Sequence, residues 1–324
     1  MPSRSLTTDP VVLRRSRRPS SGALASGALA SGVLARCMLS MLLSCALVGL
    51  GNAADDTAVP ALRITEGAGK VAIHHRVHGS LEGERALLVL IHGWSCDSSY
   101  WREQVAALAA EHAVVTVDLA GHGSSGADRD DFSMRSFGED VQRVVESLPT
   151  RAPVILIGHS MGGPVAIEAA RLLGERVRGV IGVDTFSSIG LPPPPAADTE
   201  ARIAIFLKDF PATTRVFVER SFFKPDADPA LRRWIVEDMA SADPRVAIAA
   251  LRGLNAWDGV AGLRALRVPV VTINADLART DEARISALAP NFRLVTIAGP
   301  GHFLIMEDPA RFNAALRTEL ARLR

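Results

Sequence analysis

Ser160 is the residue whose surroundings most clearly indicate chemistry. It lies in the middle of Gly158-His-Ser-Met-Gly162, a G-x-S-x-G pattern between an apolar run at 154–157 and a helical pattern at 161–173. A strand, a sharp turn and a helix in this order hold a serine hydroxyl clear of the backbone. Glycines on both sides suit the turn, because the strand and the helix pass close together there. The pattern predicts that Ser160 is a nucleophile.

The residues around Ser160 alternate between apolar runs and helical patterns. Continuous apolar runs are typical of parallel strands covered on both faces, and we expect such strands at 86–91, 113–117, 154–157 and 177–183. Helical spacing separates them at 100–110, 137–148 and 161–173. Two short strands at 62–65 and 71–78 predict an opening hairpin. The alternation predicts a parallel sheet with helices on both faces.

This alternation is interrupted after residue 190. A stiff proline-rich spacer, Leu191-Pro-Pro-Pro-Pro195, is followed by helical patterns at 199–208, 213–222, 229–240 and 244–254. Strands then return at 268–273 and 292–297, and a last helix is expected at 308–323. A helical block between two strands predicts a lid over the carboxyl ends of the sheet. Its large aromatic residues either line a substrate pocket or form the core of the lid; they are Phe206, Phe210, Phe217, Phe222, Phe223 and Trp234.

Four motifs, taken together, resemble those of the α/β-hydrolase superfamily over about residues 60–324. They are His92-Gly-Trp94, Asp118-Leu-Ala-Gly-His-Gly-Ser-Ser125, Gly158-His-Ser-Met-Gly162 and Gly299-Pro-Gly-His-Phe303. The resemblance implies an α/β fold, with a mostly parallel sheet flanked by helices and a helical lid between the sixth and seventh strands. The expected divisions are a hydrolase core at 60–190 and 257–324 and a lid at 191–256.

The resemblance also implies partners for Ser160. A serine hydroxyl is a weak nucleophile until an imidazole removes its proton, and His302 stands where the family keeps this base. The backbone N–H groups of Trp94 and Met161 are expected to form the oxyanion hole, each contributing about 3 kcal/mol to transition-state stabilisation. His92 is interpreted as shaping the loop that carries Trp94.

The acid that orients His302 has two candidates. The usual family position, on the loop after the next-to-last strand, is occupied here by Ala278, with Asp276 two residues earlier. Asp184 ends the preceding strand, in a stretch that resembles one subgroup of haloalkane dehalogenases with the acid at that place. We favour Asp184 and keep Asp276 as the alternative. Dehalogenation itself is disfavoured, because attack by Ser160 on a haloalkane would leave an ether with no carbonyl for water to attack.

Composition and motifs indicate neither a nucleic-acid partner nor a cofactor. The formal net charge of +1 gives no reason to expect nucleic acid. No His, Cys and carboxylate cluster has the spacing of metal ligands, and no glycine-rich phosphate loop is present. Asp118 and His122 are interpreted as polar groups that stabilise their loop. The expected partner is a small, ester-like molecule, and the oligomeric state stays open.

The first fifty-odd residues resemble an export signal. Arginines at 14–18 precede an apolar stretch at 38–50, which is too short to span a bilayer, and small residues follow. Cleavage after Ala53 would release a periplasmic or secreted protein with no stable membrane span. Cys37 and Cys45 lie in this signal, so Cys96 alone would remain and no internal disulfide is expected.

Together these features predict a serine hydrolase that cleaves carboxylic esters through an acyl-enzyme intermediate. Within the same chemistry, the alternatives are a lactone, a thioester or a C–C bond beside a ketone. An alternative of another class is a catalytically silent binding module of the same fold, since one fold serves many functions.

Overall fold

The computed structural model describes residues 60–192 and 195–323. The export signal expected over 1–53, with its cleavage site after Ala53, lies outside the described residues. Among the residues that are described, no helix has the length and apolar character needed to cross a membrane.

The described residues form an eight-stranded sheet in the order β1-β2-β4-β3-β5-β6-β7-β8. β1 and β2 pair antiparallel, β2 is antiparallel to β4, and all other neighbours are parallel. The mostly parallel sheet expected from the sequence is therefore confirmed. The strands are β1 (Arg63–Glu66), β2 (Ala72–His78), β3 (Leu87–Ile91), β4 (Val114–Val117), β5 (Val154–His159), β6 (Val177–Val183), β7 (Val270–Ala275) and β8 (Phe292–Ile297).

The three strands at the centre of the sheet are buried along their whole length, as their continuous apolar sequences require. Every residue of β3, β4 and β5 is buried. Val89 of β3 pairs with Val115 of β4 on one side and with Leu156 of β5 on the other. This central position makes the end of β5, where Ser160 follows, a well-fixed point in the fold.

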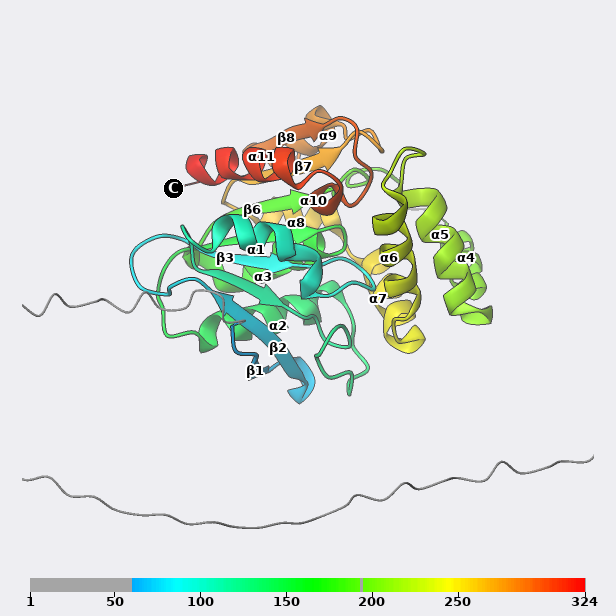
Figure 1. Cartoon of the computed structure of the whole chain (residues 1–324), viewed down its shortest axis with the longest axis horizontal. Helices are drawn as coiled ribbons and strands as arrows, with labels where there is room; N and C mark the ends of the chain where they lie inside the picture. Colours follow the sequence, from blue (N-terminus) through cyan, green and yellow to red (C-terminus); the bar gives the residue numbers. More distant parts are fainter. Residues whose placement is uncertain (1–59, 193–194, 324) are drawn as a thin grey trace, which may run out of the picture. The chain divides into compact units, whose positions relative to one another are not determined.

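Two groups of helices cover the faces of the sheet (Figure 1). One group packs together on one face and consists of α1 (Arg102–Leu108), α10 (Leu304–Glu307) and α11 (Pro309–Arg322). The other consists of α2 (Met134–Ser147), α3 (Gly162–Leu173) and α8 (Gly259–Ala265). A short helix, α9 (Glu282–Ser286), packs against β8.

Five of the described helices lie between β6 and β7 in the chain, and the first four are called the helical insertion below. These four are α4 (Ala196–Lys208), α5 (Phe210–Phe222), α6 (Pro229–Ala240) and α7 (Pro244–Ala256), of which Figure 1 shows α4, α5 and α6 side by side. Asp228 and Asp243 set the starts of α6 and α7. Their side chains accept backbone N–H bonds from Leu231 (2.7 Å) and Arg245 (2.8 Å), and a proline occupies each first turn.

Several hydrogen bonds join the helical insertion to the core, and three of them lie near the end of β5. Tyr100 Oη donates to Asp238 Oδ2 on α6 (2.7 Å), and Trp94 Nε1 donates to Ala247 O on α7 (2.7 Å). The backbone N–H of His302 donates to Phe222 O at the end of α5 (2.7 Å). Two of these bonds involve residues beside Ser160 in the site described next.

Short helices are where the sequence-based expectations differ from the structure. α8, α9 and α10 were not expected, because they hold too few residues to display a helical period. α2 begins at Met134 rather than at 137, because the Ser133 hydroxyl accepts the backbone N–H of Ser136 and caps the helix there.

Candidate active site

Ser160 stands on a strained turn between β5 and α3. Its φ angle is 52°, in the left-handed region that non-glycine residues rarely adopt. The surrounding backbone holds this conformation, since Ser160 N donates to Val183 O (2.9 Å) and Thr185 Oγ1 donates to Ser160 O (2.9 Å). Such strain persists only where neighbouring groups fix it, and it is concentrated at functional sites.

Steric constraints explain why the G-x-S-x-G pattern has glycine at its first and last positions. A Cβ atom on Gly158 would overlap the carbonyl oxygen of Gly162, and a Cβ atom on Gly162 would overlap the carbonyl oxygen of Ile91. Both positions therefore require glycine, so that the turn between β5 and α3 can form and pack against the end of β3.

The structure brings His302 and Asp184 together. Asp184 directly follows β6, and its Oδ2 accepts a hydrogen bond from His302 Nδ1 at 2.5 Å. Its other oxygen, Oδ1, accepts the backbone N–H of Ala275 (2.9 Å), and both side chains are 11% exposed. With both oxygens bonded, the carboxylate has a fixed orientation toward the imidazole.

Asp276, the alternative acid, does not meet His302. Its side chain is 42% exposed and forms an ion pair with Lys224, which follows α5. Oδ1 also accepts the backbone N–H of Gly299 (3.1 Å). The hydrogen bond from Lys224 lowers the pKa of Asp276 below its ordinary value. Asp276 thus fastens the helical insertion to the loop that leads to His302.

Four hydrogen bonds hold the backbone around His302. His302 N donates to Phe222 O, and His302 O accepts from His159 Nε2 (2.9 Å). The carboxylate of Glu307 accepts the N–H groups on both sides, from Gly301 (2.9 Å) and from Phe303 (3.0 Å). Burial raises the pKa of Glu307, and these two N–H bonds act in the opposite direction.

Three other rings contact the imidazole of His302, and one of them is Phe303, with its centroid 5.2 Å away. Phe222 stacks on the imidazole with a centroid separation of 4.3 Å and an interplanar angle of 24°, and the His159 ring lies 4.7 Å away. Burial, together with the charge that His302 can carry, holds the pKa of His159 well below its usual value. His159 is therefore neutral beside His302.

The His-Gly-Trp loop lies against Ser160. A Cβ atom on Gly93 would lie 3.2 Å from Ser160 Cβ, so the backbone that leads to Trp94 passes directly beside the serine. His92 fastens this loop, because its Nε2 accepts Leu119 N–H (3.0 Å) and its Nδ1 donates to Gly93 O (2.8 Å). Met161, on the other side of Ser160, stands at the amino end of α3, where N–H groups are available to an anion.

Ser160 and His302 line the same small cavity. Its volume is about 10 Å³, on the order of what one water molecule needs. The remaining lining residues come from the core and from the helical insertion; they are Gly93, Trp94, Cys96, His159, Phe303, Phe222 and Met239. Cys96 is buried and donates from Sγ to Trp94 O (3.3 Å), so it packs behind the loop.

The other lid aromatics expected from the sequence fall into separate contacts. Trp94 meets Phe206, Phe210 and Phe217 edge to face, with centroids 5.7 to 6.3 Å apart. Trp234 instead lies against Tyr100. The three phenylalanine rings form an aromatic layer against Trp94 of the His-Gly-Trp loop.

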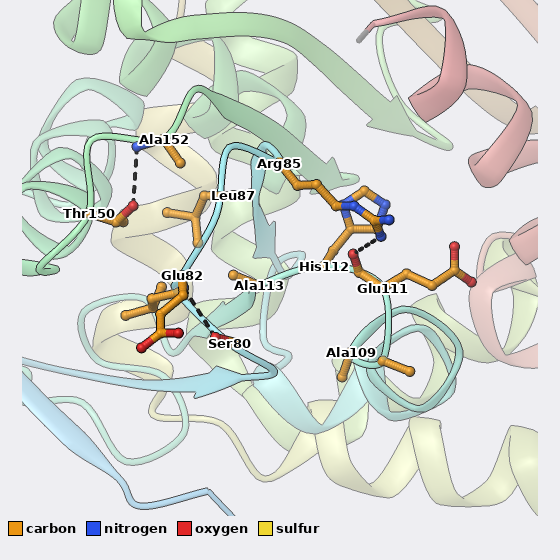
Figure 2. A pocket seen from close by; sticks show the side chains of 12 residues that line it. Ser80, Glu82, Arg85, Leu87, Ala109, Glu111, His112, Ala113, Thr150 and Ala152 are labelled. Carbon is orange, nitrogen blue, oxygen red and sulfur yellow. Dashed lines mark hydrogen bonds between the residues drawn. The ribbon is translucent and has the colours of Figure 1, made fainter.

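Figure 2 shows a larger cavity, of about 330 Å³, at the opposite end of the strands. It lies beside Leu87, Ala113 and Ala152, which are at or just before the starts of β3, β4 and β5. One of its walls is closed by a hydrogen bond from Arg85 to Glu111 O (2.6 Å). Its position separates it from Ser160, which follows the carboxyl end of β5.

Glu307 and Lys224 were not identified from the sequence. Glu307 lies five residues after His302 and precedes the Asp308-Pro309 start of α11, so it reads as an ordinary helix-terminal carboxylate. The signal for Lys224 is weaker still, because its partner Asp276 lies 52 residues away in the chain. Among the described residues, no three His, Cys, Asp or Glu side chains gather as a metal site.

The fold agrees with comparisons with known proteins. Residues 88–315 match the model of the alpha/beta hydrolase family. The pimeloyl-(acyl-carrier protein) methyl ester esterase of Edwardsiella ictaluri is 30% identical over 240 residues, covering 71% of this chain and 91% of that protein. The chain therefore belongs to the α/β-hydrolase family, and it is a hydrolase.

Solved structures of similar fold include two esterases. Esterase RhEst1 from Rhodococcus sp. ECU1013 superposes with a TM-score of 0.68 at 26% identity, covering 81% of this chain and 99% of that one. A thermophilic esterase from Thermogutta terrifontis gives a TM-score of 0.71 at 24% identity, with coverage of 81% and 99%. The second likeness concerns the fold alone.

Proposed function

We propose that this hydrolase cleaves small carboxylic esters through an acyl-enzyme intermediate on Ser160. His302 acts as the general base and acid, and Asp184 orients its imidazole. The hydrogen bond between His302 Nδ1 and Asp184 Oδ2, beside a cavity that Ser160 shares, carries the proposal. A histidine bonded to a carboxylate through Nδ1 keeps Nε2 for proton transfer with a nucleophile.

In the acylation step, Ser160 Oγ attacks the ester carbonyl carbon while His302 Nε2 accepts the hydroxyl proton. The carbonyl oxygen becomes an oxyanion, which the N–H groups of Trp94 and Met161 stabilise. The bond to the alkoxy oxygen then breaks, and His302 passes its proton to this oxygen. An alcohol leaves, and the acyl group stays on Ser160.

Water completes the reaction by the same route. His302 Nε2 removes a proton from a water molecule, which attacks the acyl carbon. The second tetrahedral intermediate collapses when its bond to Ser160 Oγ breaks, and His302 returns the proton to this oxygen. A carboxylic acid is released. Asp184 stays ionised throughout and stabilises the imidazolium.

Two of the similar proteins support an ester as the substrate. The Edwardsiella ictaluri relative is named for the hydrolysis of a methyl ester, and its alignment includes most of both chains. The Rhodococcus structure is also that of an esterase. Amide or carbamate cleavage would use the same groups, so substrate turnover has to be measured directly.

The test is acid release from methyl butyrate and from p-nitrophenyl butyrate, compared between the wild type and Ser160→Ala. We expect the substitution to reduce kcat on the order of 10⁶-fold, to the background rate. A fluorophosphonate should label the wild type at Ser160 and leave the variant unlabelled. Full activity of Ser160→Ala would contradict the mechanism, and a wild type that neither hydrolyses esters nor reacts with the probe would indicate a silent binding module.

A further inference from the structure

We propose that Phe222 determines specificity by limiting the alcohol portion of the ester to a small alkyl group. The proposal rests on the proposed ester hydrolysis and adds the substrate class to it: esters of short primary alcohols, such as methyl and ethyl esters. Phe222 is the last residue of α5, so the helical insertion brings this ring to the core.

The contacts of Phe222 place it directly over the general base. Its ring stacks on the imidazole of His302 at a centroid distance of 4.3 Å, and its carbonyl oxygen accepts the His302 backbone N–H. A Cβ atom on Gly301 would overlap the same carbonyl oxygen, so this close approach depends on glycine at position 301. Phe222 is therefore fixed to His302 through both its side chain and its backbone.

The chemistry of acylation decides which half of the ester meets Phe222. His302 has to give its proton to the departing alkoxy oxygen, so the alcohol portion lies beside the imidazole. The other neighbours of that imidazole belong to the core: Asp184 binds Nδ1, and the rings of His159 and Phe303 lie 4.7 and 5.2 Å away. Phe222 is the ring that the helical insertion adds beside the space of the leaving group.

The space beside Ser160 and His302 is small. The cavity that these residues share measures about 10 Å³. Among the described residues, Phe222 and Met239 are the lining side chains that come from the helical insertion. Of these two, the Phe222 ring is the one stacked on His302, so a larger alcohol needs space that this ring occupies.

Further contacts hold the Phe222 segment in place. Phe217, one turn earlier on α5, meets the Phe222 ring edge to face with centroids 5.1 Å apart. Lys224, two residues later, forms its ion pair with Asp276 of the core. Displacement of the ring thus works against contacts on both sides, which favours small alcohols over large ones.

The experiment measures kcat/KM for methyl, ethyl, propyl and butyl butyrate with the wild type and Phe222→Ala. These alcohols have nearly equal acidity, so differences in rate report on fit. We expect Phe222→Ala to raise the butyl-to-methyl ratio of kcat/KM at least tenfold. In a second series with a constant alcohol, from methyl acetate to methyl hexanoate, the acyl-length profile should change less than threefold.

Val216→Ala is the matched control, because Val216 lies on the same helix and is 50% exposed. It should leave both series unchanged. Phe222→Leu keeps an apolar side chain of intermediate size and should give an intermediate ratio, which preserves the test if Phe222→Ala folds poorly.

Three outcomes would overturn the assignment of Phe222: an unchanged butyl-to-methyl ratio in folded Phe222→Ala and Phe222→Leu, a change confined to the acyl series, or an equal shift in Val216→Ala. Failure of the proposed function is distinguishable, because the wild type would then lack Ser160-dependent turnover of methyl butyrate. Ser160-dependent turnover with unaltered alcohol selectivity in the Phe222 variants would reject the role of Phe222 alone.

Discussion

At the scale of single residues, the structure separates two aspartates that the sequence left as alternatives. Asp184 bonds His302 Nδ1 and the Ala275 N–H, whereas Asp276 is more exposed and pairs with Lys224. Both aspartates stand at the carboxyl end of a strand, so their different hydrogen-bond partners distinguish them. Asp184 directly follows β6, the strand beside β5 that precedes Ser160, whereas Asp276 follows β7, one strand further away.

Asparagine substitutions should show different effects at the two positions. We expect Asp184→Asn to lower kcat on the order of 10⁴-fold, because an amide no longer holds His302 in the required tautomer. Asp276→Asn should lower kcat less than tenfold, since it alters a contact with the helical insertion. Steady-state kinetics on methyl butyrate measure kcat for both variants, and circular dichroism is the folding control. A collapse of turnover in Asp276→Asn alone would reverse the assignment.

At the scale of elements, short segments position the candidate site residues Ser160 and His302. The turn between β5 and α3 presents Ser160, and the loop between β8 and α10 presents His302. Glu307, at the end of α10, accepts both N–H groups that flank His302. Burial raises the pKa of Glu307, and the charge that His302 can carry acts in the opposite direction, so the two groups interact electrostatically.

Glu307→Gln should therefore move the pH profile as well as the rate. The carboxylate stabilises the imidazolium form of His302, so its removal makes that form easier to deprotonate. We expect the acid limb of kcat/KM against pH to shift to lower pH, together with a lower maximum. Glu282→Gln is the control, because Glu282 also accepts a backbone N–H, that of Leu294 (2.9 Å). An unshifted acid limb in Glu307→Gln would indicate that Glu307 acts on structure alone.

At the scale of the whole described fold, buried neutral histidines connect stability to pH. Burial lowers the pKa values of His92, His122 and His159, and for His122 burial together with the neighbouring His92 lowers it to about 3. The unfolded chain binds protons on these groups near their ordinary pKa of 6.5. The stabilisation from neutral burial is therefore complete above pH 6.5 and is lost as the pH falls below it.

His122→Asn should reduce this pH dependence. Between pH 4 and 6 the unfolded state binds a proton at His122 that the folded state does not bind. Replacement removes up to about 1.4 kcal/mol per pH unit from the slope of the free energy of unfolding. Urea denaturation at several pH values measures this slope in both proteins. Parallel curves for the two proteins would show that His122 does not contribute to it.

Much of the fold follows from local sequence. Long apolar runs such as 86–91 and 154–159 have no stable place except a buried parallel strand, and the alternation with helices leads to the confirmed α/β sheet. The turn at Ser160 is also visible locally, because Gly158 and Gly162 lie within two residues of it. Short helices such as α8 and α10 were not predicted from the sequence, because a few residues cannot display a helical period.

What the sequence by itself determined was the fold class, the family resemblance and the separate candidates Ser160, His302, Asp184 and Asp276. Only the tertiary structure decided which carboxylate lies beside His302, and which residues hold the histidine in place. Phe222 and Glu307 reach it from α5 and α10. The physical reason is that hydrogen bonds and ring stacking depend on distances in space of a few ångströms. Residues far apart in the chain acquire such distances only when strand order and helix packing bring them together.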